Sequence, residues 1–127
     1  MDEKGIARKY LITSLTIKNL ELDLRKIQNS TLKIKGPYIQ LIEKMISKAI
    51  NGRRKLKQEM FKRNIQVTYL YTQGDFVTYK YLLNGKVEEV PFYKYKLKKD
   101  VEEFLQNLHP IYYKSILENG IFYLIKR

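Results

Sequence analysis

Apolar residues in the first part of the chain recur every three to four positions, which is the period of an amphipathic helix. Between residues 6 and 27, six of them fall within about 100° of arc at 100° per residue, and a second, narrower stripe accompanies them. The main stripe consists of Ile6, Tyr10, Ile17, Leu20, Leu24 and Ile27. The pattern predicts a helix over 6–27 that packs on two sides. A strand over the β-branched segment 10–17 is the competing interpretation.

A short alternating segment follows this helix. Leu32 and Ile34 alternate with lysines, which predicts a strand over 30–35. The next residues are Gly-Pro, and Pro37 suits the first position of a helix. Apolar residues at helical spacing then predict a second helix over 38–50.

The pair Asn51-Gly52 interrupts this helical pattern. Both residues tolerate left-handed dihedral angles and often end a helix. In a helix that continued through them, the side chains of Arg53 and Lys57 would lie on the apolar face. We therefore expect a break, followed by a third helix over 53–63. One uninterrupted helix to residue 63 is the alternative, because later apolar residues stay in phase with the earlier face. The side chains expected to face inward from the third helix are Leu56, Met60 and Phe61.

The period changes to two after residue 64, and this predicts strands. Alternation runs through 65–72 and 76–83 and resumes over 87–93. Only short Gly-containing turns separate the three segments. We therefore expect a three-stranded antiparallel meander.

The second turn of the meander, Asn84-Gly85, is the strongest short hairpin signal. Closing it as a two-residue loop sets Lys80 opposite Glu89, a complementary charge pair that supports this register. Pro91 cannot donate a backbone hydrogen bond, so the third strand is expected at an edge of the sheet.

The last part of the chain returns to helical spacing over 97–108, and His109-Pro110 ends this helix. A further helical piece is expected over 111–117, and a closing strand over 121–125. The fold class is therefore α+β: three N-terminal helices, a three-stranded antiparallel meander and a C-terminal helix. We expect one domain over 1–127, with a helical part over 6–63, the meander over 64–95 and the helix and tail strand over 96–127.

This order of elements is winged-helix-like. In a winged helix the third helix enters the major groove of DNA and the β-hairpin contacts the backbone or the minor groove. The likeness rests on element order alone. The Asn51-Gly52 turn is shorter than the usual three to four residues, and no polar N-cap residue precedes Arg53.

Positive charge is concentrated in the same region. The chain has 25 lysines and arginines against 13 acids, a net charge of +12. Residues 31–65 hold ten of these bases and only two acids. Such a field attracts polyanions, with nucleic acid as the first candidate, followed by an anionic membrane surface and an acidic protein.

Ten residues of this region and of the hairpin form the candidate nucleic-acid site. Arginine suits guanine, glutamine suits adenine and lysine suits phosphate. The candidates are Lys44, Lys48, Arg53, Arg54, Lys55, Lys57, Gln58, Lys62, Arg63 and Lys86. A helix face that is merely solvated is the competing interpretation of such a charge run.

Tyrosine is abundant around the expected sheet, with six residues on or beside it: Tyr69, Tyr71, Tyr79, Tyr81, Tyr93 and Tyr95. Aromatic rings on an open sheet can stack unpaired bases. The structural interpretation is favoured, because tyrosine has a high strand propensity and the segment 66–95 has no net charge.

Catalytic chemistry is poorly represented. The chain has no cysteine, His109 is its only histidine, and no phosphate-binding lysine loop or dinucleotide glycine pattern occurs. We therefore expect no enzyme activity, no cofactor and no metal site. No apolar run of 18 residues and no N-terminal signal pattern is present, so a cytoplasmic protein without a membrane span is expected.

Residue usage adds a hint about the source. Lysine outnumbers arginine 19 to 6 and isoleucine occurs 14 times, as expected for AT-rich genes of low-GC bacteria and their phages or plasmids. The favoured function is a small nucleic-acid-binding protein, a regulator that binds duplex DNA. The alternative is a protein-interaction module, such as a phage-type inhibitor or adaptor, that docks on an acidic partner protein.

Overall fold

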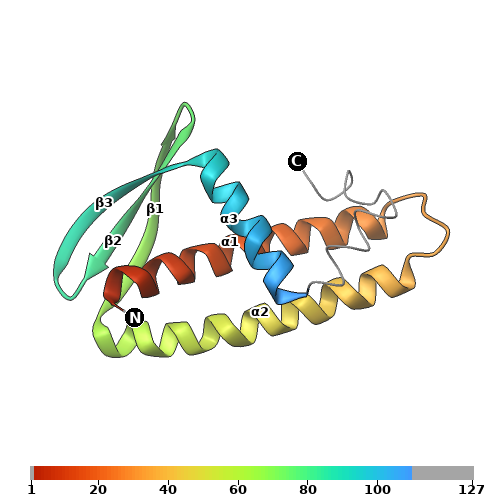
Figure 1. The fold of residues 1–127 in the computed structure, drawn as a ribbon, viewed down its shortest axis with the longest axis horizontal. Coiled ribbons are helices and arrows are strands. Elements are labelled where there is room, and N and C mark those ends of the chain that lie inside the picture. Colours follow the sequence, from red (N-terminus) through yellow and green to blue (C-terminus); the bar gives the residue numbers. More distant parts are fainter. Residues whose placement is uncertain (1, 110–127) are drawn as a thin grey trace.

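The chain folds into a hairpin of two long helices with a three-stranded sheet at one end, as a computed structural model describes for residues 2–109 (Figure 1). The elements follow in the order α1 (Glu3–Gln28), α2 (Gly36–Arg63), β1 (Ile65–Gln73), β2 (Phe76–Leu83), β3 (Lys86–Tyr93) and α3 (Lys94–Leu108). The sheet lies where α1 begins and α2 ends, and α3 returns from it across α1.

Helix α1 confirms the helix predicted over 6–27 and extends it at both ends. Asp2 caps it, because the Asp2 carboxylate accepts a hydrogen bond from the backbone N–H of Gly5 at 2.8 Å. Glu3 lies in the first turn and two basic residues lie in the last, which is the arrangement that the helix dipole favours. The strand considered over 10–17 does not form.

Helix α2 runs through Asn51-Gly52 without a break, so the prediction of a separate third helix over 53–63 is wrong and the uninterrupted alternative holds. The helix ends instead at Asn64, which adopts the left-handed conformation (φ 55°, ψ 54°). A helical glycine costs only about 1 kcal/mol relative to alanine. Apolar packing of Ala49 and Met60 on either side of Gly52 therefore outweighs the local signal for a stop.

Two further details of the helical prediction are wrong. Phe61 was expected to face inward but is 89% exposed. The strand predicted over 30–35 is also wrong, because these residues form the connection between the two antiparallel helices. Ser30 closes that connection by donating its hydroxyl to the carbonyl of Ile27 at 2.7 Å, and Ile34 is 70% exposed. A strand there would have no neighbouring strand to pair with.

The three-stranded meander forms as predicted, but a bulge between Tyr69 and Tyr71 interrupts the alternation expected over 65–72. Its strand order is β1-β2-β3, so β3 with Pro91 is an edge strand as expected. Asn84 and Gly85 both have positive φ, 52° and 88°, which is the geometry that a two-residue hairpin turn requires. The turn pairs Leu83 with Lys86 and sets Lys80 opposite Glu89.

Helix α3 confirms the helix predicted over 97–108 and begins directly after the sheet. The backbone N–H of Lys94 donates to the carbonyl of Asp75 at 2.8 Å, which fixes the start of α3 to the β1–β2 turn. His109 is the C-cap residue. The helical piece predicted over 111–117 and the strand predicted over 121–125 lie outside the described residues.

The winged-helix-like architecture is wrong, although the α+β class holds. Two helices rather than three precede the sheet, and the segment 53–63 is the C-terminal part of α2. It packs along α1 instead of standing out as an independent helix. No recognition helix of the winged-helix kind is therefore available in the described part of the chain.

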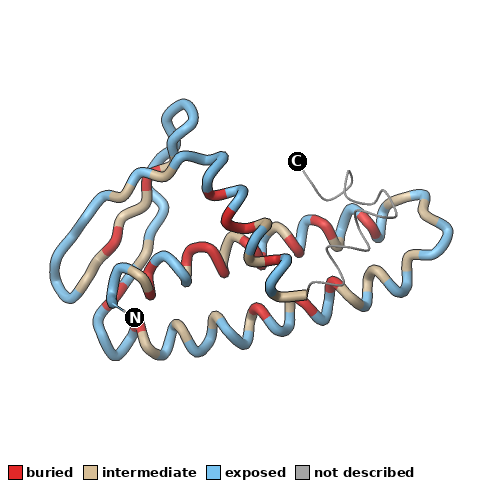
Figure 2. The backbone as a smooth tube through the Cα atoms, in the orientation of Figure 1, coloured by how far each residue is buried: buried red, intermediate tan, exposed pale blue. Residues whose placement is uncertain are grey.

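The apolar core lies between the helices and continues under the sheet (Figure 2). One cluster joins the three helices, and a second joins the start of α1 and the end of α2 to the inner face of the sheet. The second cluster consists of Ile6, Ala7, Met60, Ile65 and Tyr81. Among the described residues, the outward face of α2 contributes no side chain to either cluster.

Candidate nucleic-acid interface

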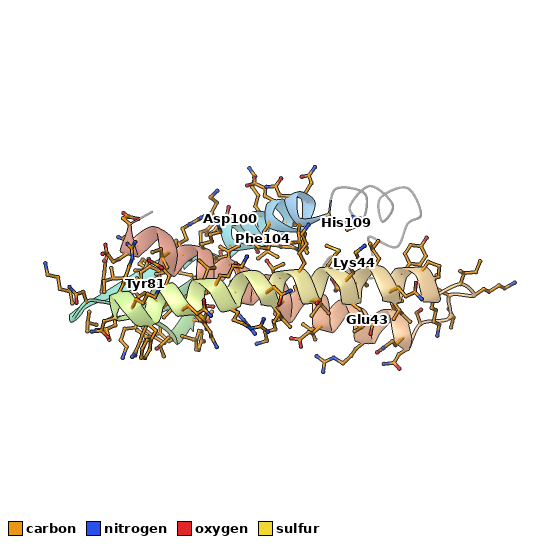
Figure 3. The ribbon with its side chains drawn as sticks, turned by 90° about the horizontal axis from the view of Figure 1, so that it is seen from below. Glu43, Lys44, Tyr81, Asp100, Phe104 and His109 are labelled. Carbon is orange, nitrogen blue, oxygen red and sulfur yellow. The ribbon has the colours of Figure 1, made fainter. Side chains whose placement is uncertain are left out.

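Four lysines line up along the outward face of α2. Because residues four or seven apart lie on one side of a helix, these four fall within about 40° of arc and span about 27 Å. We call Lys44, Lys48, Lys55 and Lys62 the lysine stripe. All four are exposed. In Figure 3, Lys44 lies on the side of α2 that faces α3, and Glu43 lies on the other side.

The stripe has two polar neighbours among the predicted residues. Arg54 and Gln58 are exposed on the same outward half of α2. The Arg54 guanidinium donates to the Asn51 side-chain oxygen at 3.1 Å, so Asn51 orients this arginine instead of breaking the helix.

Two other predicted residues point elsewhere. Arg53 is half-buried, because it follows Ala49 and precedes Leu56 in the row that faces α1. Its long aliphatic stem allows it to lie in that row. Lys57 is exposed on the flank of α2 beside β1, where it lines a groove with Met60.

The last two predicted residues lie near the end of α2. Arg63 donates its Nε to the Glu59 carboxylate at 2.9 Å, one turn back along the helix. Lys86 follows the Asn84-Gly85 turn, and this turn is held at the end of α2 because the Asn84 backbone N–H donates to the Asn64 carbonyl at 3.0 Å. Lys86 is thus placed at one end of the stripe.

The lysine stripe makes no ion pair with any acidic side chain of residues 2–109. Helix α2 contains only two acids, Glu43 and Glu59, and Glu59 pairs with Arg63. The positive charge of the stripe is therefore not compensated within this part of the protein.

A groove of about 650 Å³ borders the stripe where α1, α2 and α3 meet. Its apolar lining includes Ala49, Leu56 and Phe104, and Figure 3 labels Phe104 on α3 beside α2. Three lysines line it, Lys9 from α1 and Lys48 and Lys55 from the stripe, and no acidic residue is among the described lining residues. The Lys48 amine donates to the carbonyl of Leu108 at 3.2 Å, which links α2 to the end of α3.

Sequence reasoning missed Lys9. It lies 39 positions before Lys48, and only the antiparallel packing of α1 on α2 brings the two to one groove. No local pattern in the sequence could have indicated this.

No group of three or more His, Cys, Asp or Glu side chains within 2–109 could hold a metal ion. Burial raises the pKa of Tyr81 to about 12 and also raises the pKa of Tyr79, but both lie on the inner face of the sheet and not beside the stripe. No helix in the described part of the chain is long and apolar enough to cross a membrane.

Comparison with known proteins gives the family. The family described as YhjD protein matches residues 1–110, and the chain belongs to this family. It is similar to "Uncharacterized protein YhjD" of Bacillus subtilis (strain 168), with 30% identity over 96 residues that cover 76% of this chain and 78% of that protein. No solved structure matches the chain.

Proposed function

We propose that the protein binds nucleic acid, with duplex DNA favoured, through the lysine stripe of α2. The observation that carries this proposal is the alignment of four exposed lysines without acidic partners along one helix. A helix face that serves solvation alone commonly mixes lysines with glutamates one turn apart, because such pairs stabilise the helix. Glu59 lies one turn after Lys55, but its carboxylate pairs with Arg63 and with none of the four lysines of the stripe.

The mode of binding differs from that of a winged helix. α2 lies flat along α1, so the stripe would follow phosphates along the duplex instead of inserting the end of a helix into the major groove. Arg54 and Gln58, beside the stripe, have the chemistry to contact guanine and adenine edges. Lys9 would add a further amine across the groove. A regulator of this kind acts in the cytoplasm, where bacterial DNA is found.

The salt dependence of binding tests the proposal. If the four stripe lysines each neutralise one phosphate, log K falls against log salt with a slope of about −3.6. The affinity for a 20-base-pair duplex then falls by about 150-fold between 50 and 200 mM salt. The variant with all four stripe lysines changed to alanine should lose most of this slope, as measured by fluorescence anisotropy.

A matched variant separates a defined site from diffuse attraction. Changing Lys18, Lys33, Lys98 and Lys99 to alanine removes the same net charge from exposed positions elsewhere. This control should keep most of the slope. Equal loss in both variants, or no binding of the parent protein at 50 mM salt, would show that the stripe is not a nucleic-acid site. A single-stranded RNA of equal length, run in parallel, tests the preference for duplex DNA.

A further inference from the structure

The two edges of the sheet differ in how they are protected. The outer strand β3 contains Pro91 together with Lys86, Glu88 and Glu89, which are the residue types that prevent further strands from adding to an edge. The opposite edge, β1, has nine residues with no charge and no proline. A bulge between Tyr69 and Tyr71 interrupts its second half, so the regular, unprotected part of this edge is residues 65–69.

The register identifies the backbone groups that β1 leaves open. Across the two-residue turn, Leu83 and Lys86 form a hydrogen-bonded pair, so alternate residues of β2 bond to β3 and the others to β1. Gln66 and Thr68, opposite Leu82 and Lys80, therefore bond to β2.

The intervening residues of β1 have no such partner. Ile65, Val67 and Tyr69 direct their N–H and C=O groups away from the sheet. No other backbone group within 2–109 bonds to them.

A groove of about 560 Å³ runs beside this open edge. Residues 64–68 form one side, and the last turns of α2 with Tyr10 of α1 form the other. Phe61 lines it and is 89% exposed, the largest exposure among the exposed apolar residues of the described chain. Met60 adds apolar surface, and Lys57 is its one charged lining residue among those described. The groove thus combines unpaired backbone groups, an aromatic ring and an amine.

We propose that β1 and this groove bind an extended acidic segment of a partner protein, which adds to the sheet as a fourth strand. The open N–H and C=O groups of Val67 and Tyr69 would pair with the segment's backbone, as in other cases of strand addition. Apolar side chains of the segment pack against Met60 and Phe61, and a carboxylate meets Lys57.

Charge and shape favour this occupant over a second copy of the chain. The net charge of +12 attracts an acidic segment and repels another copy. In addition, α2 forms the far wall of the groove. A single strand can lie between β1 and α2, whereas the β1 of a second copy has its own β2 on its other edge.

The probe for the test is a nine-residue peptide of alternating glutamate and valine, titrated into ¹⁵N-labelled full-length protein. The open amides of Val67 and Tyr69 should become protected from hydrogen exchange by at least about tenfold, because they gain hydrogen-bond partners. The amides of Gln66 and Thr68 should be protected with or without the peptide. A peptide with lysine in place of glutamate, and one with proline in place of valine, should not bind.

Two exposed residues supply variants that leave the core intact. Phe61→Ser and Lys57→Glu should each weaken peptide binding, the second by about fivefold or more. Lys44→Glu, which is the same change at the other end of α2, is the matched control and should have a smaller effect. Phe61→Ser should leave affinity for duplex DNA unchanged, so this proposal and the proposed function can fail separately.

Several results would overturn the proposal. They are no binding of the glutamate peptide at millimolar concentration, equal effects of Lys57→Glu and Lys44→Glu, and peptide-induced changes that fall on the lysine stripe and spare β1. Protection of Val67 and Tyr69 without peptide, in a dimer detected by sedimentation, would assign the edge to a second copy instead.

Discussion

The lysine stripe of α2 and several basic residues around the sheet and α3 have opposite surroundings. Four basic side chains around the sheet and α3 contact carboxylates: Lys4 contacts Glu88 at 2.8 Å, Arg8 and Lys96 both contact Asp100, and Lys94 lies 3.7 Å from Asp75. On α2, the lysine stripe contacts no carboxylate of residues 2–109.

The location of these pairs explains the difference. Most join separate elements, α1 to β3, α1 to α3, and the start of α3 to the β1–β2 turn. These charges therefore help to hold the sheet and α3 on the helical hairpin. The stripe joins no elements through its charges, except for the hydrogen bond from Lys48 to the end of α3. Its field is directed to solvent, where it is available to a polyanion.

Charge reversal within the lysine stripe should give the largest effect, and the quantity affected is the affinity for nucleic acid. Changing Lys48 and Lys55 to glutamate puts two negative charges in the middle of the stripe, so affinity for duplex DNA at 50 mM salt should fall by at least about 100-fold. The thermal midpoint should fall only slightly, because no ion pair is lost and the one interaction removed is the hydrogen bond from Lys48 to the Leu108 carbonyl. Anisotropy and a thermal melt measure the two quantities. The double change Lys98→Glu and Lys99→Glu on α3 is the matched control, and an equal fall in affinity there would contradict the contrast.

Asp100→Asn should lower the stability of the protein and leave its DNA affinity unchanged, which is the reverse of the result expected for the stripe. Asp100 is 9% exposed and holds two cations, so the neutral amide loses both ion pairs. Because Arg8 and Lys96 are themselves half or more exposed, we expect a loss of about 2 kcal/mol, below that of a fully buried pair. Urea unfolding measures it, while DNA affinity should stay the same. Asp75→Asn, at an exposed pair, should cost less than about 0.5 kcal/mol; equal costs would show that the burial of Asp100 does not matter.

The buried Tyr81 predicts how the stability of the protein depends on pH. Its side chain is 1% exposed, its hydroxyl has no hydrogen-bond partner among residues 2–109, and burial raises its pKa to about 12 from the ordinary 10. The folded state holds the phenolic proton of Tyr81 more tightly than the unfolded state does. The protonated hydroxyl therefore makes its full contribution to stability below pH 10, and this contribution is lost as pH rises from 10 to 12. Stability should therefore fall by about 1 kcal/mol between pH 8 and 11.

The variant Tyr81→Phe should lack this part of the alkaline loss. At pH 8 it should be as stable as the parent or slightly more stable, because a buried hydroxyl without a partner is removed. Denaturant unfolding at the two pH values measures both effects. The exposed Tyr71→Phe is the control. If both variants keep the parent's pH dependence, burial of Tyr81 does not control it.

The sequence predicted the sheet well because its signals are local. Alternation sets which residues of β2 and β3 share a face, and Asn84-Gly85 fixes the register of this pair. The bulge between Tyr69 and Tyr71 in β1 was not predicted. Pro91 correctly indicated an edge. The lack of charged residues in β1 is visible in its sequence. The groove beside it is not, because that groove depends on where α2 and Tyr10 pack.

The helical half was predicted less well because tertiary packing decided it. Asn51-Gly52 has the local chemistry of a helix stop, yet α1 offers a continuous apolar surface to the row that contains Ala49, Leu56 and Met60. The same error affected the candidate site. In any helix over 53–63, Arg53 and Lys57 lie on the opposite side from Lys55 and Lys62. The continuity of α2 adds the alignment of Lys44 and Lys48 with Lys55 and Lys62.

Gly52→Ala should give the smallest effect among these predictions, and the quantity affected is the stability of the protein. Gly52 lies between Lys48 and Lys55, in the middle of the stripe. A Cβ at Gly52 would meet no atom within 4 Å, and the residue is inside a helix with no left-handed dihedral angle. Alanine should therefore raise stability by about 0.5–1 kcal/mol, since it loses less backbone entropy on folding than glycine. A thermal melt gives the sign.

Gly85→Ala is the matched control and should destabilise, because Gly85 has φ 88°. A lower midpoint for Gly52→Ala would mean that α2 breaks at this position in solution. The lysine stripe would then be divided in two, and the contrast between α2 and the rest of the molecule would fail at its centre.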